Sequence, residues 1–503
     1  MALILDYAFP IAAALLLVVF YAGLPALQNC RLPSASPERR GRGLDVLWLL
    51  LITGVYAFVA FTDLGDTAAP QSFVPMAGQS AVFGLEERPA ELMLYTGVGM
   101  GGYRIEISDN GTDYAPLTED FTQDHVAVLK WHSLPLETEG QGPCYVKISC
   151  TNGEPWLGEV VFRDAEGAAL PIGASIRELA DEQALVPERY SLSNSTYFDE
   201  IYHARTALEH IEGLWPYEIS HPPLGKILMG LGIRLFGMTP FGWRFTGTFF
   251  GVLMLPLMYA FLKKLYGGGA VPALGTVVFA ADFMHFVQTR IATIDTYGVF
   301  FILLMYLFFW GWYQDGRKLD LALSGVCFGL GAASKWTCLY AGAGLVAEHP
   351  YSSSWWQWLV DARPILYYLE YGEGTVSSIA AFVSPLLCWA GLVSVLLLIV
   401  RAVHKRDRRA LFIVIGYLAQ LVPWMVVSRL TFAYHYFAAV VFLVLALCAV
   451  FDEMRAKGHI RWMYAFTGVS LALFAMFYPV LTGVEVSRYY SWKVLKWFPS
   501  WPL

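Results

Sequence analysis

Apolar segments close to the length that crosses a bilayer recur along the whole chain. A transmembrane helix needs about 20 mostly apolar residues, and ten stretches of this sequence approach that length. Charged residues make up only 15% of the chain, whereas an average soluble domain has roughly 25%. The composition therefore excludes a cytosolic globular enzyme and predicts a polytopic α-helical membrane protein. The predicted spans are residues 8–28, 44–62, 241–262, 268–288, 296–313, 321–348, 377–400, 410–428, 431–450 and 463–483.

Lysine and arginine clusters set the expected orientation of these spans. They fall in alternate loops, beginning with residues 31–42 between the first two spans and ending with residues 455–461. Because basic loops stay in the cytoplasm, all of these loops belong on one side. Residues 1–62 are then two N-terminal transmembrane helices joined by a basic cytoplasmic loop. The first span lacks a basic n-region and a small-residue cleavage site, so we expect a retained helix.

Residues 63–195, called the inserted domain below, differ from the rest of the chain in charge. They contain 21 acidic and 7 basic side chains, whereas the remainder has 20 acidic and 27 basic ones. The net charge of −7 thus hides an acidic soluble domain within a basic membrane protein. By the charge pattern this domain lies outside the cytoplasm, and nothing in the sequence predicts a nucleic-acid partner.

Short alternating runs in the inserted domain predict β-strands. The turn pairs Asn110-Gly111 and Asn152-Gly153 punctuate them, which is typical of an antiparallel β-sandwich. The order of the runs resembles the discoidin-like, galactose-binding-like jelly rolls. Two interpretations stay open: a module that binds carbohydrate or presents an acceptor, and a rigid cap or assembly surface. The predicted strand runs are residues 91–95, 103–108, 126–131 and 145–149.

The seven cysteines show neither a metal-type pair nor a dense disulfide framework. Two of them, Cys144 and Cys150, fall in the inserted domain. On one extended strand they would lie roughly 20 Å apart, far beyond disulfide reach. We therefore interpret all seven as structural thiols: Cys30, Cys144, Cys150, Cys327, Cys338, Cys388 and Cys448.

Adjacent carboxylates follow the inserted domain in the segment YFDEIYHARTALEHIEGLWPYEISHPPLGK. Asp199 and Glu200 belong to an amphipathic stretch close to the outer membrane surface. Such a pair is usually just a solvated helix face. Here, however, His221 and two prolines impose a stiff extended turn, and Lys226 comes next. Acid and base are therefore expected near the same interface.

Several ionisable residues lie in or beside the predicted spans. Such groups are costly at membrane depth unless they are paired or face a wet cavity, so each is a functional candidate. The alternative is an internal ion pair that only fixes helix packing, or, for a lone histidine, a satisfied packing residue. Outer carboxylates facing several cations would suit transfer of a group from an anionic lipid. The candidates are Arg244, Asp282, His285, Arg290, Asp295, Lys335 and His435.

Seven motifs of residues 196–483, in order, resemble the signatures of the protein O-mannosyltransferases, glycosyltransferase family 39 of the GT-C fold. They are FDE, HPPLGK, GWRF, DFMHFVQTRIATID, SKW, HPYSSSWWQWLVDARPILYY and RLTFAYHY. The resemblance implies that residues 196–503 form a GT-C glycosyltransferase domain with an inverting reaction. The donor would be a polyprenyl-phosphate-linked sugar, most simply mannose, and the acceptor a Ser or Thr hydroxyl at the outer membrane face.

The resemblance also assigns roles to the candidate residues. Asp199 would be the general base that deprotonates the acceptor, and Glu200 beside it would support the geometry of the substrate. Arg244, Arg290 and Lys335 would hold the lipid phosphate, and no metal or other cofactor would be needed. Further donor-binding positions would be His221, Lys226, Asp295 and His435.

The chain departs from the family pattern at two places. The inserted domain and one additional helix precede the FDE motif, and the stretch between Lys335 and His349 is short where relatives have another pair of spans. Three alternatives stay open: a non-protein acceptor in the cell envelope, a lipid or sugar transporter, and a binding protein anchored by its helices. We expect an integral protein of a bacterial plasma membrane that contacts membrane lipids. The sequence predicts no oligomeric state.

Overall fold

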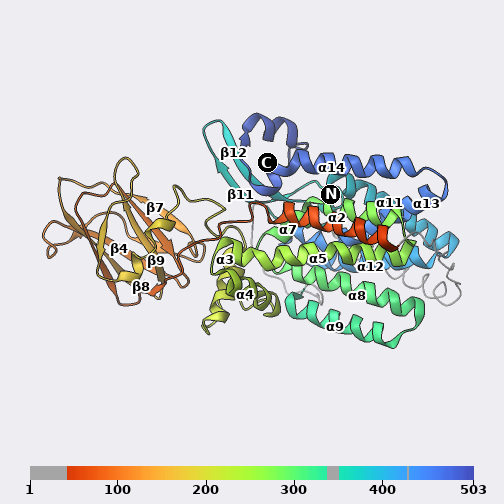
Figure 1. Cartoon of the computed structure of the whole chain (residues 1–503), viewed down its shortest axis with the longest axis horizontal. Helices are drawn as coiled ribbons and strands as arrows, with labels where there is room; N and C mark the ends of the chain where they lie inside the picture. The colour runs from red at the N-terminus through yellow and green to blue at the C-terminus, as the bar shows by residue number, and fades with distance from the viewer. Residues whose placement is uncertain (1–41, 337–350, 428–429) are drawn as a thin grey trace. The chain divides into compact units, whose positions relative to one another are not determined.

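The computed structural model (Figure 1) describes residues 42–336, 351–427 and 430–503, which fall into two compact units. The first unit contains the described parts of residues 1–62 and 247–503, together with the turn 221–225. The second contains residues 63–220 and 226–246 and so extends beyond the inserted domain. The predicted domain boundaries at residues 62 and 195 stay predictions. The predicted span 8–28, together with Cys30 and Cys338, lies outside the described residues.

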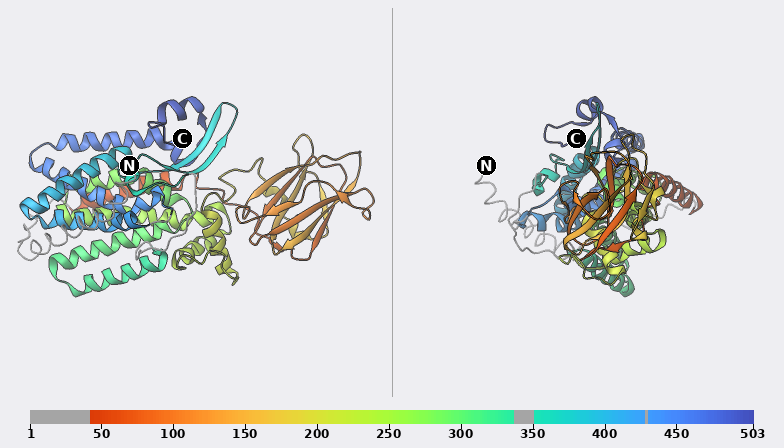
Figure 2. Two further views of the ribbon diagram at one scale, coloured as in Figure 1. Left: turned by 180° about the vertical axis from the view of Figure 1, so that it is seen from behind. Right: turned by 90° about the vertical axis from the view of Figure 1, so that its left-hand side faces the viewer.

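Two antiparallel sheets form the centre of the inserted domain, and Figure 2 shows them as two layers. One sheet has the order β1-β9-β3-β7; the other has the order β10-β2-β8-β4-β5, with β6 also paired to β4. The strands are β1 (Val74–Pro75), β2 (Ser80–Leu85), β3 (Glu91–Thr96), β4 (Gly101–Ser108), β5 (Ala115–Pro116), β6 (Phe121–Gln123), β7 (Trp131–Pro135), β8 (Cys144–Gly153), β9 (Trp156–Arg163) and β10 (Ile172–Ala174).

The facing surfaces of the two sheets share one hydrophobic core. Phe83 of one sheet meets Phe162 of the other edge-on, with ring centroids 5.5 Å apart. The outer face of the β3–β9 sheet is also covered, because Tyr95 and Trp131 pack there in a second cluster. Burial on both faces explains why β3 reads as an unbroken apolar run, LMLY, in place of an alternating one. The likeness to galactose-binding jelly rolls stays a prediction.

Three of the four predicted strand runs coincide with β3, β4 and β8. The fourth, residues 126–131, is wrong: these residues form a loop, and β7 begins only at Trp131. Leu129 adopts φ +54°, in the left-handed region, where an extended strand cannot continue. Cys144 and Cys150 lie on the same strand and are free thiols, as predicted.

Helices complete the second unit after the sheets. Helix α3 (Glu200–Ile211) follows directly on Asp199, and α4 (Leu224–Phe236) and the first residues of α5 (Pro240–Tyr266) come next. The buried face of α3 is polar, since it includes Glu200, His203, Arg205 and Glu209. Glu200 pairs with Arg244, and Arg205 pairs with Glu209, as described below.

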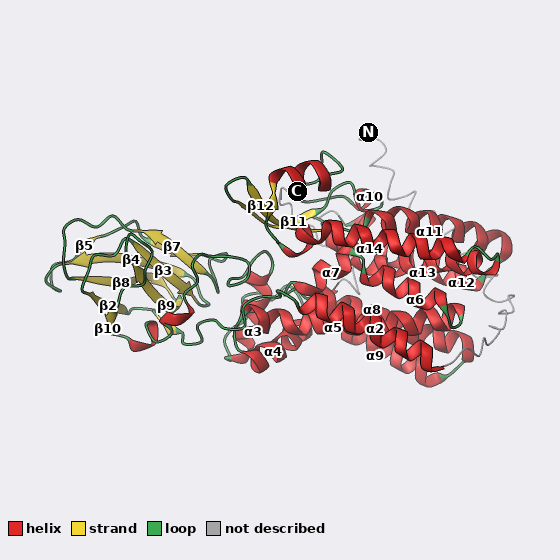
Figure 3. Ribbon diagram, turned by 45° about the horizontal axis from the view of Figure 1, so that its top comes forward, coloured by secondary structure: helices red, strands yellow, loops and turns green. Residues whose placement is uncertain are grey.

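The first unit is a bundle of helices that run alongside one another (Figure 3). Helices α8 and α9 are one antiparallel neighbour pair, and α11, α12 and α13 pack together as another group. The helices are α2 (Arg42–Phe61), the rest of α5, α6 (Ala270–Ala280), α7 (Phe283–Arg290), α8 (Asp295–Asp315), α9 (Lys318–Ser334), α10 (Trp355–Trp358), α11 (Pro385–Lys405), α12 (Arg408–Val426), α13 (Phe437–Ala456) and α14 (Ile460–Thr482).

Among the described residues, five helices are long and apolar enough to cross a membrane. They are α5, α8, α11, α13 with the short turn before it, and α14. A sixth is possible if α6 and α7 count as one span, although they are bent by 55° at a short break. The chain is thus a polytopic membrane protein, and the predicted number of ten crossings stays a prediction. The end of the predicted span 321–348 lies outside the described residues.

Two predicted spans differ from the structure. The span 268–288 is not one straight helix, because it breaks at Ala281 and Asp282, where Asp282 caps α7 by accepting from the His285 amide. The span 377–400 begins too early. Residues 375–381 are strand β12 (Thr375–Ala381), which pairs with β11 (Ile365–Tyr371), and helix α11 starts only at Pro385. A short apolar run fits a strand and a helix equally well, so its period could not separate them.

Candidate functional site

The two predicted catalytic carboxylates lie at the start of α3 and face different surroundings. Asp199 is the N-cap residue, is half-buried, and does not use its side chain to cap the helix. The preceding Phe198 has φ +49°, a strained conformation for a side chain of this size. Glu200, by contrast, is fully buried. After the sharp turn at Phe198, the Asp199 carboxylate is thus partly accessible and the Glu200 carboxylate is enclosed.

Glu200 is held by Arg244 in a bidentate ion pair. The arginine Nε donates to Oε1 at 2.7 Å, and NH2 donates to Oε2 at 2.8 Å. The amide of Tyr197 and the indole of Trp243 also donate to Oε2, each at 3.3 Å. A buried carboxylate that accepts from four donors is held in one position, which suits a group that positions its neighbour.

Arg244 also holds the two ends of the inserted domain. Its NH1 donates to the Leu64 carbonyl at 3.0 Å, and its NH2 donates to the carbonyls of Leu192 and Ser195 at 2.9 and 3.1 Å. Gly65 permits this approach, since a Cβ there would lie 2.7 Å from the guanidinium. Arg244 is 1% exposed. These contacts favour a positioning role, and the predicted phosphate contact stays a prediction.

Two further buried ion pairs lie on α3 and in the segment that follows it. Lys226 contacts the carboxylate of Glu218 and donates to its backbone carbonyl at 2.6 Å. Arg205 pairs with Glu209 at 2.7 Å one helical turn away. Neither Glu218 nor the Arg205–Glu209 pair was predicted as part of a site. The spacing of residues 205 and 209 was the available signal, because positions i and i+4 meet on one helix face.

In the first unit, Asp295 and Lys335 form a buried ion pair. Lys335 Nζ lies 2.5 Å from Asp295 Oδ1 and also stands over the ring of Tyr434 at 5.3 Å. Asp295 is the first residue of α8, and Lys335 directly follows α9. Because α8 and α9 are antiparallel neighbours, their paired ends bring together two residues that are 40 positions apart. The sequence marks both residues as candidates but does not predict that they pair.

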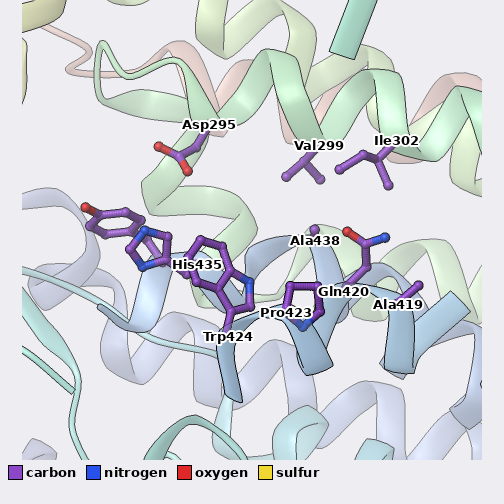
Figure 4. Close-up of a pocket in the computed structure, with 10 residues that line it drawn as sticks. Asp295, Val299, Ile302, Ala419, Gln420, Pro423, Trp424, His435 and Ala438 are labelled. Carbon is purple, nitrogen blue, oxygen red and sulfur yellow. The ribbon is translucent and has the colours of Figure 1, made fainter. Parts of the chain in front are cut away.

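A pocket opens beside this ion pair (Figure 4). It encloses about 410 Å³ of space, its open mouth included. In the figure, Asp295, Val299 and Ile302 of α8 lie across from Gln420, Pro423 and Trp424 of α12. Proline cannot donate to the residue four positions earlier, so Pro423 leaves the Ala419 carbonyl without a helical partner in the pocket wall. The lining combines apolar side chains with a few polar groups, as ligand pockets do.

His435 lines the same pocket within an aromatic environment. Its ring centroid is 4.1 Å from that of Trp424 and 4.5 Å from that of Tyr434. Its Nδ1 lies 3.0 Å from the Phe432 amide, which fixes the ring in the short turn before α13. The prediction named His435, but Trp424 and Gln420 were missed because nothing in the apolar sequence of α12 marks the pocket-facing positions.

The other predicted residues of the first unit have structural partners. Arg290 donates to the backbone carbonyls of Ala60 and Thr62 at 3.1 and 2.7 Å, at the C-terminal end of α2. His285 lies 3.1 Å from the Tyr56 hydroxyl and 3.2 Å from the Gly251 carbonyl, as a satisfied packing histidine would. His221 is half-buried in the turn before α4.

The predicted residues therefore form two local groups. Asp199, Glu200, Lys226 and Arg244 belong to the second unit; His221, Arg290, Asp295, Lys335 and His435 belong to the first. The second-unit group offers the half-buried Asp199 carboxylate, which can accept a proton. The first-unit group offers a cation beside a pocket with aromatic walls and polar acceptors. These are the parts that proton removal and anion stabilisation require.

Comparisons with known proteins identify the family. A model described as dolichyl-phosphate-mannose-protein mannosyltransferase matches residues 220–389. A second, described as the C-terminal four-transmembrane region of protein O-mannosyltransferase, matches residues 333–501. Both matches begin after Asp199 and Glu200.

Curated relatives and a solved structure agree with these models. A polyprenol-phosphate-mannose–protein mannosyltransferase of Mycobacterium tuberculosis is 22% identical, with 56% of this chain and 81% of the relative covered. Its namesake in Mycolicibacterium smegmatis is also 22% identical, with 60% and 87% covered. The Saccharomyces cerevisiae Pmt1–Pmt2 complex bound to the sugar donor shares the fold, with a TM-score of 0.54 at 12% identity over 62% of this chain and 90% of that one. The chain belongs to the protein O-mannosyltransferase family of polytopic GT-C membrane proteins.

Proposed function

We propose that the chain transfers mannose from a polyprenyl-phosphate-mannose donor to a Ser or Thr hydroxyl of a protein at the outer face of a bacterial plasma membrane. The observation that carries this proposal is Asp199 beside Glu200, with Glu200 locked by Arg244. The names of the curated relatives supply the donor and the acceptor class. A protein acceptor is preferred to another envelope molecule for the same reason.

Asp199 acts as the general base in this proposal. Its carboxylate takes the proton of the acceptor hydroxyl while the oxygen attacks the anomeric carbon of mannose. The bond from that carbon to the phosphate oxygen breaks, and polyprenyl phosphate leaves with the bonding electrons. One displacement inverts the anomeric configuration. Glu200 serves as a positioning residue, because its four donors hold the first turn of α3 and hence the Asp199 backbone.

Lys335 is the best-supported phosphate ligand among the predicted cations. Arg244 and Arg290 are engaged by carboxylate and backbone oxygens. Lys335 is held by Asp295, which lines the pocket. The ammonium group of Lys335 has three N–H donors, and one of them donates to Asp295 Oδ1. The others would offset the charge that grows on the leaving phosphate. His435, across the pocket from Asp295, would contact the sugar or phosphate.

Transfer by the purified full-length chain is the direct test. The protein in detergent or nanodiscs would be incubated with radiolabelled polyprenyl-phosphate-mannose and a set of Ser/Thr peptides. We expect label in peptide, released by conditions that cleave O-linked sugars, with the anomer opposite to that of the donor. Labelled envelope glycan without labelled peptide would replace the protein acceptor, and uptake of donor into vesicles without transfer would favour a transporter.

Replacing Lys335 should weaken donor use more than acceptor use. For Lys335→Met we expect the KM for the donor to rise about tenfold or more, since charge-assisted phosphate contacts are among the stronger hydrogen bonds. Lys335→Arg should retain part of the affinity because it keeps the charge. Inhibition by polyprenyl phosphate alone should weaken in parallel with donor KM.

Lys457→Met is the matched control in the same unit. Lys457 makes an exposed pair with Glu453, with 62% of its side chain accessible, so its loss should leave donor KM unchanged. An unchanged donor KM in a folded Lys335→Met protein would remove Lys335 from the phosphate site.

A further inference from the structure

A loop of the inserted domain is hydrogen-bonded to the segment that leads into helix α3. This loop, residues 124–130, connects β6 to β7 and is called the 124–130 loop below. The Thr196 amide donates to the Leu129 carbonyl at 3.1 Å, and its hydroxyl donates to the Val128 carbonyl at 2.8 Å. The Trp131 amide donates to the Ser195 hydroxyl at 3.2 Å. The loop is therefore anchored three residues before Asp199.

The tip of the loop is fixed and points outward. Asp124 accepts from the amides of Val126 and Ala127 at 2.9 and 3.0 Å, which closes a tight turn. Asp124, His125 and Val126 are all exposed. At the other end of the loop, Leu129 sits at φ +54°. A left-handed leucine is strained and persists only where its surroundings impose it, here through its carbonyl bond to Thr196.

His125 begins a row of nearly parallel rings that crosses from the loop to α3. The His125 and Tyr202 centroids are 6.4 Å apart at 16°, and those of Tyr202 and Tyr217 are 6.3 Å apart at 3°. The Arg205 guanidinium lies 4.0 Å from the Tyr217 centroid and supports that end. Tyr202 is half-buried, and His125 and Tyr217 are exposed. These three residues are called the aromatic row below.

The aromatic row lies beside Asp199. Tyr202 is three positions later on α3, so the two side chains share one helix face, and its amide donates to the Asp199 carbonyl at 3.1 Å. Burial raises the pKa of the Tyr202 phenol, and the nearby charges of Asp199, Tyr217 and Asp124 raise it further. The contact between the His125 and Tyr202 rings brings the 124–130 loop and α3 together at this point.

We propose that the inserted domain forms one wall of the acceptor site, and that His125, Tyr202 and Tyr217 bind the extended, uncharged polypeptide on which the reacting Ser or Thr lies. This inference rests on the proposed function and names the acceptor-contacting surface of that site. Rigid aromatic rings bury peptide surface at low entropic cost, and a line of them suits an extended chain. Asp124 and Asp199 flank the row, so acidic residues beside the hydroxyl would be repelled.

Point variants of the full-length chain are better tests than deletion of the domain. Deletion would remove the Val128 and Leu129 carbonyls that hold Thr196, so it would disturb Asp199 whatever the row binds. His125 has an exposed side chain on the loop tip, and its replacement leaves those bonds in place. His125→Phe preserves the ring, whereas His125→Ala removes it.

The expected result is an effect on peptide KM alone. For His125→Ala, we expect the KM for an uncharged Ser/Thr peptide to rise about threefold to tenfold, as loss of one aromatic contact predicts. The kcat and the donor KM should stay unchanged, and His125→Phe should restore the peptide KM. With the unaltered chain, a peptide carrying Glu on both sides of the hydroxyl should show a higher KM than its Ala counterpart.

Tyr145→Ala is the matched control. Tyr145 is an exposed aromatic residue near the opposite end of β8 from Gly153. The Gly153 end adjoins β6 and the loop through Gly101, roughly 27 Å away by strand rise. This variant should leave peptide KM unchanged.

Three results would overturn the inference: an unchanged peptide KM in His125→Ala, equal losses in His125→Ala and His125→Phe, or binding of mannose oligosaccharides in place of peptide at the row. If the unaltered chain transfers no mannose, the proposed function fails separately. The row is then tested by direct binding of the labelled peptide, with the same order of affinities expected among the variants.

Discussion

Asp199→Asn is expected to lower the rate of mannose transfer by about 10²–10⁴, the contribution typical of a positioned general base. Asparagine keeps the shape of the side chain but cannot accept the acceptor's proton. Asp199 does not cap its helix, so the change should leave α3 intact. Donor KM and peptide affinity should therefore stay close to those of the unaltered chain, and the loss should fall on kcat.

The control for this prediction is Asp120→Asn, which makes the same chemical change in the same compact unit. Asp120 pairs with Arg104 at 3.3 Å, and both side chains are about half exposed. Solvent screens such a pair, so its loss should alter neither kcat nor folding. An Asp199→Asn protein that transfers mannose at the normal rate would assign the proton to another group, and Glu200 would be a poor replacement because it is enclosed and saturated with donors.

The sequence predicted the parts of this protein that depend on local pattern. Runs of apolar residues marked the helices, and alternation with Asn-Gly turns marked β3, β4 and β8. Motif order indicated the family, whereas the catalytic roles of Asp199 and Glu200 stay predictions. Patterns of this kind predict the structure because the local conformational preference of each residue agrees with its role in the tertiary structure.

What the sequence could not predict are features decided by distant partners. Leu129 turned a predicted strand into a loop because its carbonyl is bound by Thr196, 67 positions later. Residues 375–381 form a strand because β11 pairs with them. Asp295 and Lys335 were each singled out as charged residues in an apolar setting, but only the antiparallel packing of α8 on α9 makes them a pair. The sequence identifies a charged residue as a site candidate, but the packing of the helices determines which residue it pairs with.

Arg244 shows why that distinction matters for function. Family resemblance suggested a phosphate ligand, whereas its donors reach Glu200 and the carbonyls of Leu64, Leu192 and Ser195. A phosphate ligand and a structural clamp predict different results for one substitution. Removing a phosphate contact weakens donor binding in a folded protein. Removing a clamp takes two of the four donors from a buried carboxylate and the guanidinium donors from three carbonyls.

We expect Arg244→Ala to destabilise the second unit by about 3–5 kcal/mol, the cost of leaving one partner of a buried ion pair uncompensated. The unfolding midpoint of the full-length chain in detergent should fall, and transfer should be lost because Asp199 is no longer held in place. Arg244→Lys should recover only part of the midpoint, since an ammonium cannot make the two parallel bonds to Glu200. Arg104→Ala is the control, because the Arg104–Asp120 pair is exposed and its loss should leave the midpoint unchanged. An unchanged midpoint with weakened donor binding in Arg244→Ala would show that this arginine binds the phosphate after all, and the clamp would then have to be assigned to the Trp243 and backbone donors of Glu200.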